Sequence, residues 1–212
     1  TAPTGTLPPA LQPGVPIVVA SASLPTGPDH AGRWAELAGS ATGVGLSGDA
    51  ALSIEPVVAV DGATSYVAWV DARLGNYEIY VARHTAANGW EQLGGSAELG
   101  GISDSQGSSR RPALALDATG QPIVTWTEFT AAGSEIRALV WDDGLSQWVG
   151  LGNSASAGGI NQSASAGHAQ VVSTQDGPIV AWLEESGGAV NVLARRFDGV
   201  DWIDLAGSST AG

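Results

Sequence analysis

The amino-acid sequence predicts an all-β fold, a β-propeller built of four-stranded antiparallel blades. Three observations predict it: two series of Trp residues with a common spacing, alternation of apolar and polar residues within each repeat, and turn sequences between short runs. The 212 residues include 30 Gly, and 14% of them are charged, which is typical of a turn-rich β protein. No stretch carries a sustained apolar stripe at helical spacing, so we expect almost no helix.

The repeat is defined by two sets of equivalent Trp residues. Four similar segments, "WAELAGSA", "WEQLGGSA", "WVGLGNSA" and "WIDLAGSS", begin at Trp34, Trp90, Trp148 and Trp202. A second series falls at Trp69, Trp126 and Trp182. Successive members of both series lie 54 to 58 residues apart, which gives one structural period.

One repeat contains four short strands in order. The segment "PALALDATGQPIVTWTEF" predicts a strand, a turn at 117–120, and a second strand that holds Val124 and Trp126 on one face. "SEIRALVWDDG" predicts a third strand ended by turn residues, and "QWVGLGN" a short fourth. A connector rich in Gly and Ser follows. Four antiparallel strands per repeat, in tandem, are typical of propeller blades.

We expect residues 1–212 to form a single β-propeller domain of about four repeats. The expected parts are a degenerate first blade with its connector at 1–53, a second at 54–109, a third at 110–166 and a fourth at 167–212, with the blades proper at 54–95, 110–152 and 167–207. "PALQPGVPIVVASAS" matches the third repeat at Pro16, Ile17 and Val18. The alternative alignment sets "VPIVVASAS" against "YEIYVARHT" and makes this unit half a blade.

The pattern P-x-(L/V)-A-x-D, then (I/V)-x-W-x-(D/E), then G-x-x-E-I-x-V, resembles the repeats of secreted bacterial β-propellers of the TolB-like or sialidase-like kind. The resemblance is close from Pro56 to Gly207. It implies a propeller that is extracellular, at the cell surface or periplasmic, often as a module of a larger protein. It implies no particular chemistry, because this fold carries binding, scaffolding and hydrolytic functions.

Charge and composition exclude several partners. The net charge of −13 disfavours nucleic acid and anionic lipid, and no apolar run is long enough for membrane insertion. There is no Cys, so neither disulfides nor thiolate metal sites are expected. We expect no cofactor and no metal site, although a Ca²⁺ ion held by acidic side chains is the alternative. The chain also begins without Met, as a processed or excised piece would.

Acidic residues recur beside the second Trp series. Asp71, Glu128 and Glu184 each lie two positions after a series Trp, and Glu78 and Glu135 open the following strand. A ring of carboxylates could bind Ca²⁺ or act in acid–base catalysis. Because the acids repeat in every blade, whereas a catalytic pair is needed once, we favour a structural role.

The Trp residues are expected to pack between blades for the same reason. Trp141 is the exception, because the alignment sets it against Ala82 and Phe197, so it is the candidate aromatic platform for a ligand. The connectors that enter the innermost strands bring Glu55, Arg110, Arg111 and His168 towards the mouth of the axial channel. These four residues and Trp141 form the candidate ligand-binding site.

No catalytic residue is assigned from the sequence. No sialidase Asp-box, nucleophile elbow or clustered His metal motif is present. We therefore expect a non-catalytic extracellular module, not an enzyme, that recognises a protein or glycan or builds a surface assembly. The alternative is a glycosidase- or lyase-like domain that uses carboxylates at the channel mouth. We also expect the open blade faces to be covered, either by residues 1–33 or by another chain.

Overall fold

The computed structural model describes residues 36–48, 51–205 and 208. The chain divides into two compact units, residues 1–48 and 49–212. The expected degenerate first blade with its connector, at 1–53, lies outside the described residues except for 36–48 and 51–53, so Pro16 to Val18 and Trp34 are not described. Residues 36–48 form successive turns, in which the Glu36 carboxylate accepts hydrogen bonds from the Ala41 N–H at 3.0 Å and the Thr42 hydroxyl at 2.9 Å.

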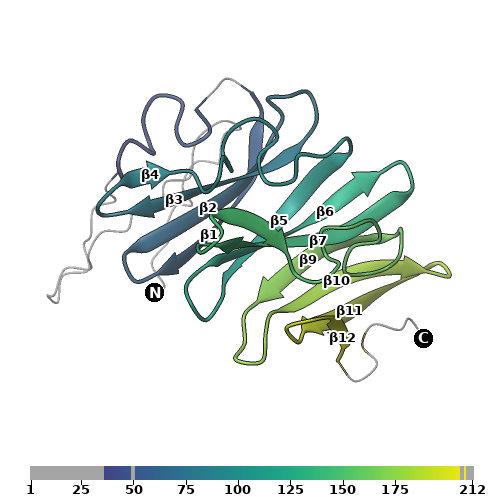
Figure 1. Ribbon diagram of the computed structural model, residues 1–212. Helices are drawn as coiled ribbons and strands as arrows, with labels where there is room; N and C mark the ends of the chain where they lie inside the picture. The colour runs from purple at the N-terminus through teal and green to yellow at the C-terminus, as the bar shows by residue number, and fades with distance from the viewer. Residues whose placement is uncertain (1–35, 49–50, 206–207, 209–212) are drawn as a thin grey trace, which may run out of the picture. The chain divides into compact units, whose positions relative to one another are not determined.

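The second unit contains three four-stranded antiparallel sheets (Figure 1). We call the three sheets the first, middle and last blades, so that the first blade corresponds to the predicted second repeat at 54–109. The first blade consists of β1 (Ser53–Asp61), β2 (Thr64–Asp71), β3 (Glu78–Thr85) and β4 (Gly89–Glu91). The middle blade consists of β5 (Ser108–Leu116), β6 (Pro122–Thr130), β7 (Gly133–Asp142) and β8 (Gln147–Gly150). The last blade consists of β9 (Ala166–Val172), β10 (Ile179–Ser186), β11 (Ala189–Phe197) and β12 (Trp202–Asp204).

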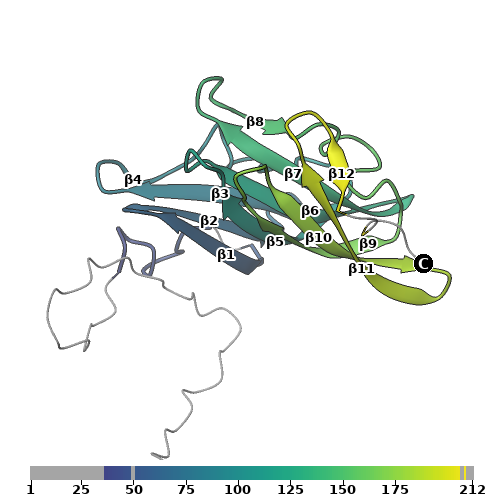
Figure 2. The ribbon, with the colours of Figure 1, turned by 90° about the horizontal axis from the view of Figure 1, so that it is seen from below.

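The prediction of an all-β, propeller-like fold with four-stranded blades is confirmed. The described residues contain no helix, and each sheet has its strands in chain order. No helix in the described part of the chain is long and apolar enough to cross a membrane. Figure 2 shows the first strands β1, β5 and β9 along one side, with the fourth strands β4, β8 and β12 away from them.

Local sequence explains the tight turns within each blade. Gly187 and Gly188 form the two-residue loop between β10 and β11, with φ angles of 60° and 83° that glycine adopts without a steric penalty. Between β5 and β6, the Asp117 carboxylate accepts the backbone N–H groups of Thr119 and Gln121 at 2.8 and 2.9 Å. These turns set the register of the strands that follow.

The core lies between the blades. One buried cluster joins Val70 and Ile79 of the first blade to Trp126 of the middle blade. A second joins Ile136 of the middle blade to Trp182 of the last. Each blade therefore packs its apolar face against the Trp-bearing face of the next, and the first strands of neighbouring blades lie in contact.

The other Trp series ties successive blades together by hydrogen bonds. The Trp148 indole N–H donates to the Leu93 carbonyl at 2.9 Å, and the Trp202 indole N–H donates to the Leu151 carbonyl at 2.8 Å. In both cases the acceptor is the Leu three residues after the preceding series Trp. The recurrence of W-x-x-L in the sequence is thus explained by a contact that each blade makes with the one before it.

Candidate functional site

The repeated acidic residues serve the fold. In each blade, the indole N–H of the series Trp donates to the carboxylate two residues later. The donor–acceptor distances are 3.3 Å for Trp69–Asp71, 3.0 Å for Trp126–Glu128 and 2.6 Å for Trp182–Glu184. The three carboxylates are buried, so each satisfies an indole N–H that would otherwise lose its water partner.

Asp71 also forms an ion pair inside the first blade. The Arg73 guanidinium donates to its carboxylate at 2.9 Å, as does the Ser53 hydroxyl. Burial acts to raise the pKa of Asp71, but the hydrogen bonds from Arg73 and Ser53 and the guanidinium charge hold it below its usual range. Asp71 is therefore ionised and occupied by structural partners.

Two carboxylates that share hydroxyl donors are buried between the first and middle blades. Glu78 and Glu128 are each 1% exposed, and both lie within hydrogen-bond distance of the Ser105 and Ser109 hydroxyls. Burial, with a contribution from the Glu128 charge, raises the pKa of Glu78. Because neither carboxylate reaches the surface, a polymeric substrate cannot approach the pair.

Trp141 is not a ligand platform, and this prediction was wrong. Trp141 is 6% exposed, and it pairs across the strands with Trp148, the ring centroids lying 5.8 Å apart. The same cross-strand position holds His84 beside Trp90 and Phe197 beside Trp202. Its equivalents are therefore His84 and Phe197, and not Ala82. Trp141 fills the regular aromatic position of the repeat.

Three β-bulges give the candidate site its backbone. The pairing of the first strand with the second is interrupted at Glu55 in β1, at Arg111 in β5 and at His168 in β9. These residues have φ angles of 56°, 57° and 58°, in the left-handed region that favours glycine. Among the described residues they are the non-glycine residues with such φ angles within strands; the others lie in turns and loops.

The three bulge residues occupy one structural position with three different side chains. They are spaced 56 and 57 residues apart, one per blade, on the strands that contact each other. A left-handed conformation costs a non-glycine residue about 1 to 2 kcal/mol. Bulges and backbone strain gather beside functional sites, where they direct a side chain. We call Glu55, Arg110, Arg111 and His168 the bulge strip.

Glu55 links the first blade to the middle blade. Its carboxylate accepts hydrogen bonds from the Arg110 guanidinium at 2.6 Å and from the Arg111 backbone N–H at 2.6 Å. Burial acts to raise the pKa of Glu55, but these two hydrogen bonds and the charges of Arg110 and Arg111 hold it below its usual range. The same ion pair raises the pKa of Arg110. The Glu55 carboxylate thus fixes the positions of the Arg110 side chain and the Arg111 backbone.

Arg111 extends the strip towards the last blade. Its side chain is exposed, and its guanidinium lies above the Phe129 ring at 5.8 Å from the centroid. A Cβ placed on Gly167 would lie 3.4 Å from Arg111 Nη1, so the guanidinium reaches the residue before His168. The His168 backbone N–H donates to the Thr127 hydroxyl at 3.3 Å, and its side chain is exposed. The structure therefore brings the four predicted strip residues onto neighbouring strands.

Two aromatic residues that the sequence did not single out support the arginines. Arg110 lies 4.4 Å from the centroid of the Tyr77 ring, and Phe129 lies beneath Arg111 as described. The aromatic face attracts the guanidinium cation in both cases. Arg110 also donates to Glu55, whereas Arg111 is the exposed guanidinium of the pair. The sequence signal for Tyr77 is its place next to Glu78, at the start of the third strand.

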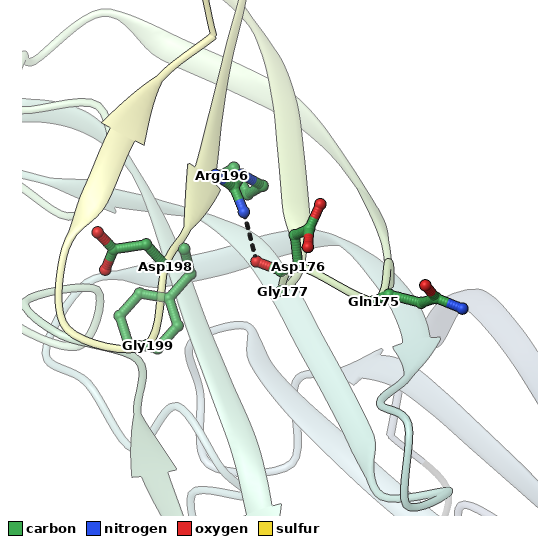
Figure 3. A pocket seen from close by; sticks show the side chains of 7 residues that line it. Gln175, Asp176, Gly177, Arg196, Asp198 and Gly199 are labelled. Carbon is green, nitrogen blue, oxygen red and sulfur yellow. Dashed lines mark hydrogen bonds between the residues drawn. The ribbon is translucent and has the colours of Figure 1, made fainter.

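A shallow hollow of about 440 Å³ lies at the other end of the last blade (Figure 3). Its lining comes from the turn after β9 and from the end of β11, and the Arg196 guanidinium donates to the Asp176 carbonyl at 2.7 Å. The hollow is open and lies beyond the end of β9, whereas His168 lies near the beginning of that strand. It is therefore separate from the bulge strip.

Metal-binding residues do not cluster in the described part of the chain. No group of three or more His, Cys, Asp and Glu side chains that could hold an ion occurs there. The acids beside the Trp series are occupied by indole, serine and arginine donors. The alternative of a Ca²⁺ ion held by the repeated acids gains no supporting geometry among these residues.

Comparison with known proteins identifies the fold. No family model and no curated protein matches the chain. An ulvan lyase of polysaccharide lyase family PL25, solved with -[GlcA(1-4)Rha3S]- bound, matches with a TM-score of 0.53 and 11% identity over 73% of this chain and 42% of that one. The GH43 endo-arabinanase from Bacillus licheniformis matches with a TM-score of 0.45 and 14% identity over 74% and 57%. The chain spans about half the length of such structures.

These comparisons correct the expected function. The sequence led us to expect a non-catalytic binding or structural module, not an enzyme. The similar structures with a TM-score above 0.5 are instead ulvan lyases of polysaccharide lyase family PL25, which are enzymes, so that expectation was wrong. They support a propeller-like fold without identifying the TolB-like or sialidase-like kind. At 11 to 15% identity the matched structures show the fold alone, and the activity of this chain is argued from its own residues.

Proposed function

We propose that the protein is a carbohydrate-active enzyme that cleaves a uronate-bearing polysaccharide by β-elimination at the bulge strip. The observation that carries the proposal is the single bulge position that holds a carboxylate, a guanidinium and an imidazole in three consecutive blades. The matched fold also includes a lyase solved with a glucuronate-containing sugar, which is consistent with this substrate class.

The chemistry fits the exposed groups of the strip. In β-elimination, a base removes the proton from the carbon next to the uronate carboxylate, while the C4–O bond breaks and a C4=C5 double bond forms. His168 would accept that proton, and Arg111 would pair with the carboxylate, whose negative charge grows as the proton leaves. The departing oxygen keeps the electron pair of the broken bond and takes a proton from water.

Glu55 and Arg110 would act as positioning residues. Their ion pair and the bond from Glu55 to the Arg111 N–H fix the bulge from which the Arg111 side chain extends. Glu55 is a poor proton donor because its pKa is held below its usual range. Hydrolysis by two carboxylates needs a proton donor and a second acid some 5 to 9.5 Å away. Glu55 is the one carboxylate among the described strip residues, so elimination is favoured over hydrolysis.

The net charge of −13 opposes the approach of an acidic polymer at long range. Salt screens such repulsion beyond about 10 Å at 0.1 M, whereas the contact between Arg111 and a carboxylate is made at close range. The proposal therefore predicts that cleavage becomes faster as moderate salt is added. Since polysaccharides of this kind lie outside cells, we also expect the protein to act there.

The test uses the full chain with a panel of uronate-containing polysaccharides. Each polymer is paired with its carboxyl-reduced form, which has the same linkages without the charge. Product is followed by the ultraviolet absorbance of the new double bond. We expect cleavage of at least one uronate polymer and none of its reduced form. Absence of unsaturated product from every polymer would contradict the proposal.

Variants assign the roles. His168→Ala removes the base and should lower kcat by a factor of about 10² to 10⁴. Arg111→Ala should lower kcat/KM, and Arg111→Lys should restore it only in part, because an ammonium lacks the planar pair of donors. Asp176→Asn, in the separate hollow, is the matched control and should cleave at the wild-type rate. Wild-type kinetics in His168→Ala would also contradict the proposal.

A further inference from the structure

Each of the first two described blades presents one buried face, formed by apolar residues and threonine, to the blade that follows it. In the first blade this face is formed by Ala68, Val70, Ile79 and Val81, all 0% exposed. In the middle blade the same positions hold Thr125, Thr127, Ile136 and Ala138, again 0% exposed. Both faces are covered by the Trp-bearing face of the next blade. We call these four positions the exit face of a blade.

The exit face of the last blade is exposed, yet it remains apolar. Its equivalent residues are Ala181, Leu183, Val192 and Ala194, of which Leu183 is 36% and Val192 72% exposed. Val172 and Val190 lie at the rim of the same face and are 55% and 64% exposed. The sheet face that is exposed to solvent normally carries polar residues. Contiguous apolar patches on soluble proteins usually mark an interaction surface.

The cross-strand pairing shows that these side chains form one continuous patch. Leu183 pairs with Val192, and Ala181 pairs with Ala194, so both pairs point to the same side of the sheet. The opposite side of the sheet holds Val180, Trp182 and Leu193, which are buried against the middle blade. The exposure of the exit face therefore reflects the lack of a following blade among the described residues, and not a change in sequence pattern.

Charges of opposite sign lie at the two ends of this patch. Glu185 pairs with Val190 at one end of β10, and Arg196 pairs with Ile179 at the other. A two-fold axis that lies between two facing sheets, perpendicular to their strands, would place Glu185 of one copy opposite Arg196 of the other. The apolar residues would then face each other at the centre, in a contact that is complementary to itself.

We propose that the exit face of the last blade pairs with the same face of a second copy of this chain. The two inner interfaces join an exit face to a Trp-bearing face. The proposed contact joins two exit faces instead, with the apolar residues at its centre and Glu185 and Arg196 at its rim. The patch involves fewer residues than a standard interface, which buries about 800 Å² per partner. The dimer should therefore be weak and should dissociate on dilution through the micromolar range.

The test is sedimentation velocity of the full chain over a series of concentrations. We expect the mean mass to rise from monomer towards dimer, and Val192→Asp to remain monomeric throughout. Val190→Asp, next to the β10–β11 turn, is the second variant and tolerates a change of side chain if Val192→Asp fails to fold. Val60→Asp is the control, because it places the same charge on a 52% exposed valine of β1, outside the exit face, and should dimerise as wild type does.

A charge exchange tests the orientation. Glu185→Arg and Arg196→Glu should each weaken the dimer, since each places like charges opposite one another. The double variant should restore it. A wild-type mass that stays monomeric overturns the proposal, and so does a dimer that forms equally with Val192→Asp. If the wild type is monomeric and Val192→Asp melts at a lower temperature than the wild type, the exit face is covered by another part of the same chain, which also overturns the proposal. A dimer in which neither single exchange has an effect overturns the two-fold arrangement.

Discussion

Two sets of equivalent positions in this molecule follow the same period but differ in what they conserve between blades. At the positions of Asp71, Glu128 and Glu184, every blade has an acid, and every acid accepts the same indole hydrogen bond. At the positions of Glu55, Arg111 and His168, every blade has the same left-handed bulge, but the side chains are an acid, a base and an imidazole.

The difference separates a structural device from a site. A buried indole N–H needs an acceptor in each blade, so the same chemistry recurs wherever the Trp recurs. A bulge needs only its backbone conformation, which glycine would supply without strain. Side chains of three kinds at a strained position are therefore not explained by folding alone. The comparison predicts that the acids affect stability, whereas the bulge residues affect activity.

The largest loss of stability is expected from substitution of a Trp whose indole N–H is bound by one of these acids. Trp126 is 2% exposed and packs between the first and middle blades. Trp126→Ala removes this contact and leaves a cavity, and should lower the free energy of unfolding by about 3 to 5 kcal/mol. Chemical denaturation of the purified protein measures it. A loss below 1 kcal/mol would show that the blades do not depend on this series.

A smaller loss of stability is expected from the acid itself. Glu184 is buried and accepts the Trp182 N–H at 2.6 Å. Glu184→Ala leaves that N–H without its acceptor and should cost about 1 to 3 kcal/mol of unfolding free energy. Asp201→Ala, an exposed acid in the turn before β12, is the control and should change it by less than about 0.5 kcal/mol. If Glu184→Ala instead abolished polysaccharide cleavage at unchanged stability, the two sets of positions would have been assigned in reverse.

The acids of the first blade should give opposite dependences on pH. The pKa of Asp71 is lowered in the folded protein, so its stabilisation is present above its unfolded pKa of about 4 and is lost as the pH falls. Asp71→Asn should therefore be less stable than wild type at neutral pH, and the gap should narrow in acid. Thermal melts across this range measure the gap, and a gap that widens in acid would contradict the account.

The contribution of Glu78 to stability depends on pH in the opposite direction. Its pKa is raised in the folded protein, so its stabilisation is complete below its unfolded pKa of about 4 and is lost as the pH rises through the folded value. Glu78→Gln removes that loss. The variant should be more stable than wild type at neutral pH and equal to it in acid. Equal stability of the two proteins at neutral pH would contradict a raised pKa for Glu78.

The fold class could be predicted from the sequence because each repeat shows alternating apolar residues and the Trp residues recur at a nearly constant spacing. The structural role of Glu128 and its equivalents could also be predicted, because an acidic residue recurs in the sequence of each blade two positions after the Trp. Trp141 was misplaced because its equivalence depends on pairing with Trp148 in a short fourth strand. That register is set in three dimensions, and the alignment placed Trp141 against Ala82, two residues before its structural equivalent His84.

The candidate site could be predicted only in outline. Connector position placed Glu55, Arg110, Arg111 and His168 near the inner strands, but no glycine marks their left-handed conformation. The strain at these residues comes from the register shift between the first and second strands. The proposed activity could not be inferred from the sequence for a related reason: a lone His and a lone Arg in separate repeats match no linear catalytic motif, and only the fold places them on neighbouring strands.

The most direct test of the separation between structural and functional positions is His168→Gly, measured for stability and for cleavage. Glycine adopts the φ of 58° without the strain that histidine carries. The account predicts that the variant gains up to about 1 kcal/mol of unfolding free energy, while polysaccharide cleavage falls by a factor of about 100 or more. A variant that is less stable than wild type and cleaves at the wild-type rate would contradict it, because His168 would then serve the fold.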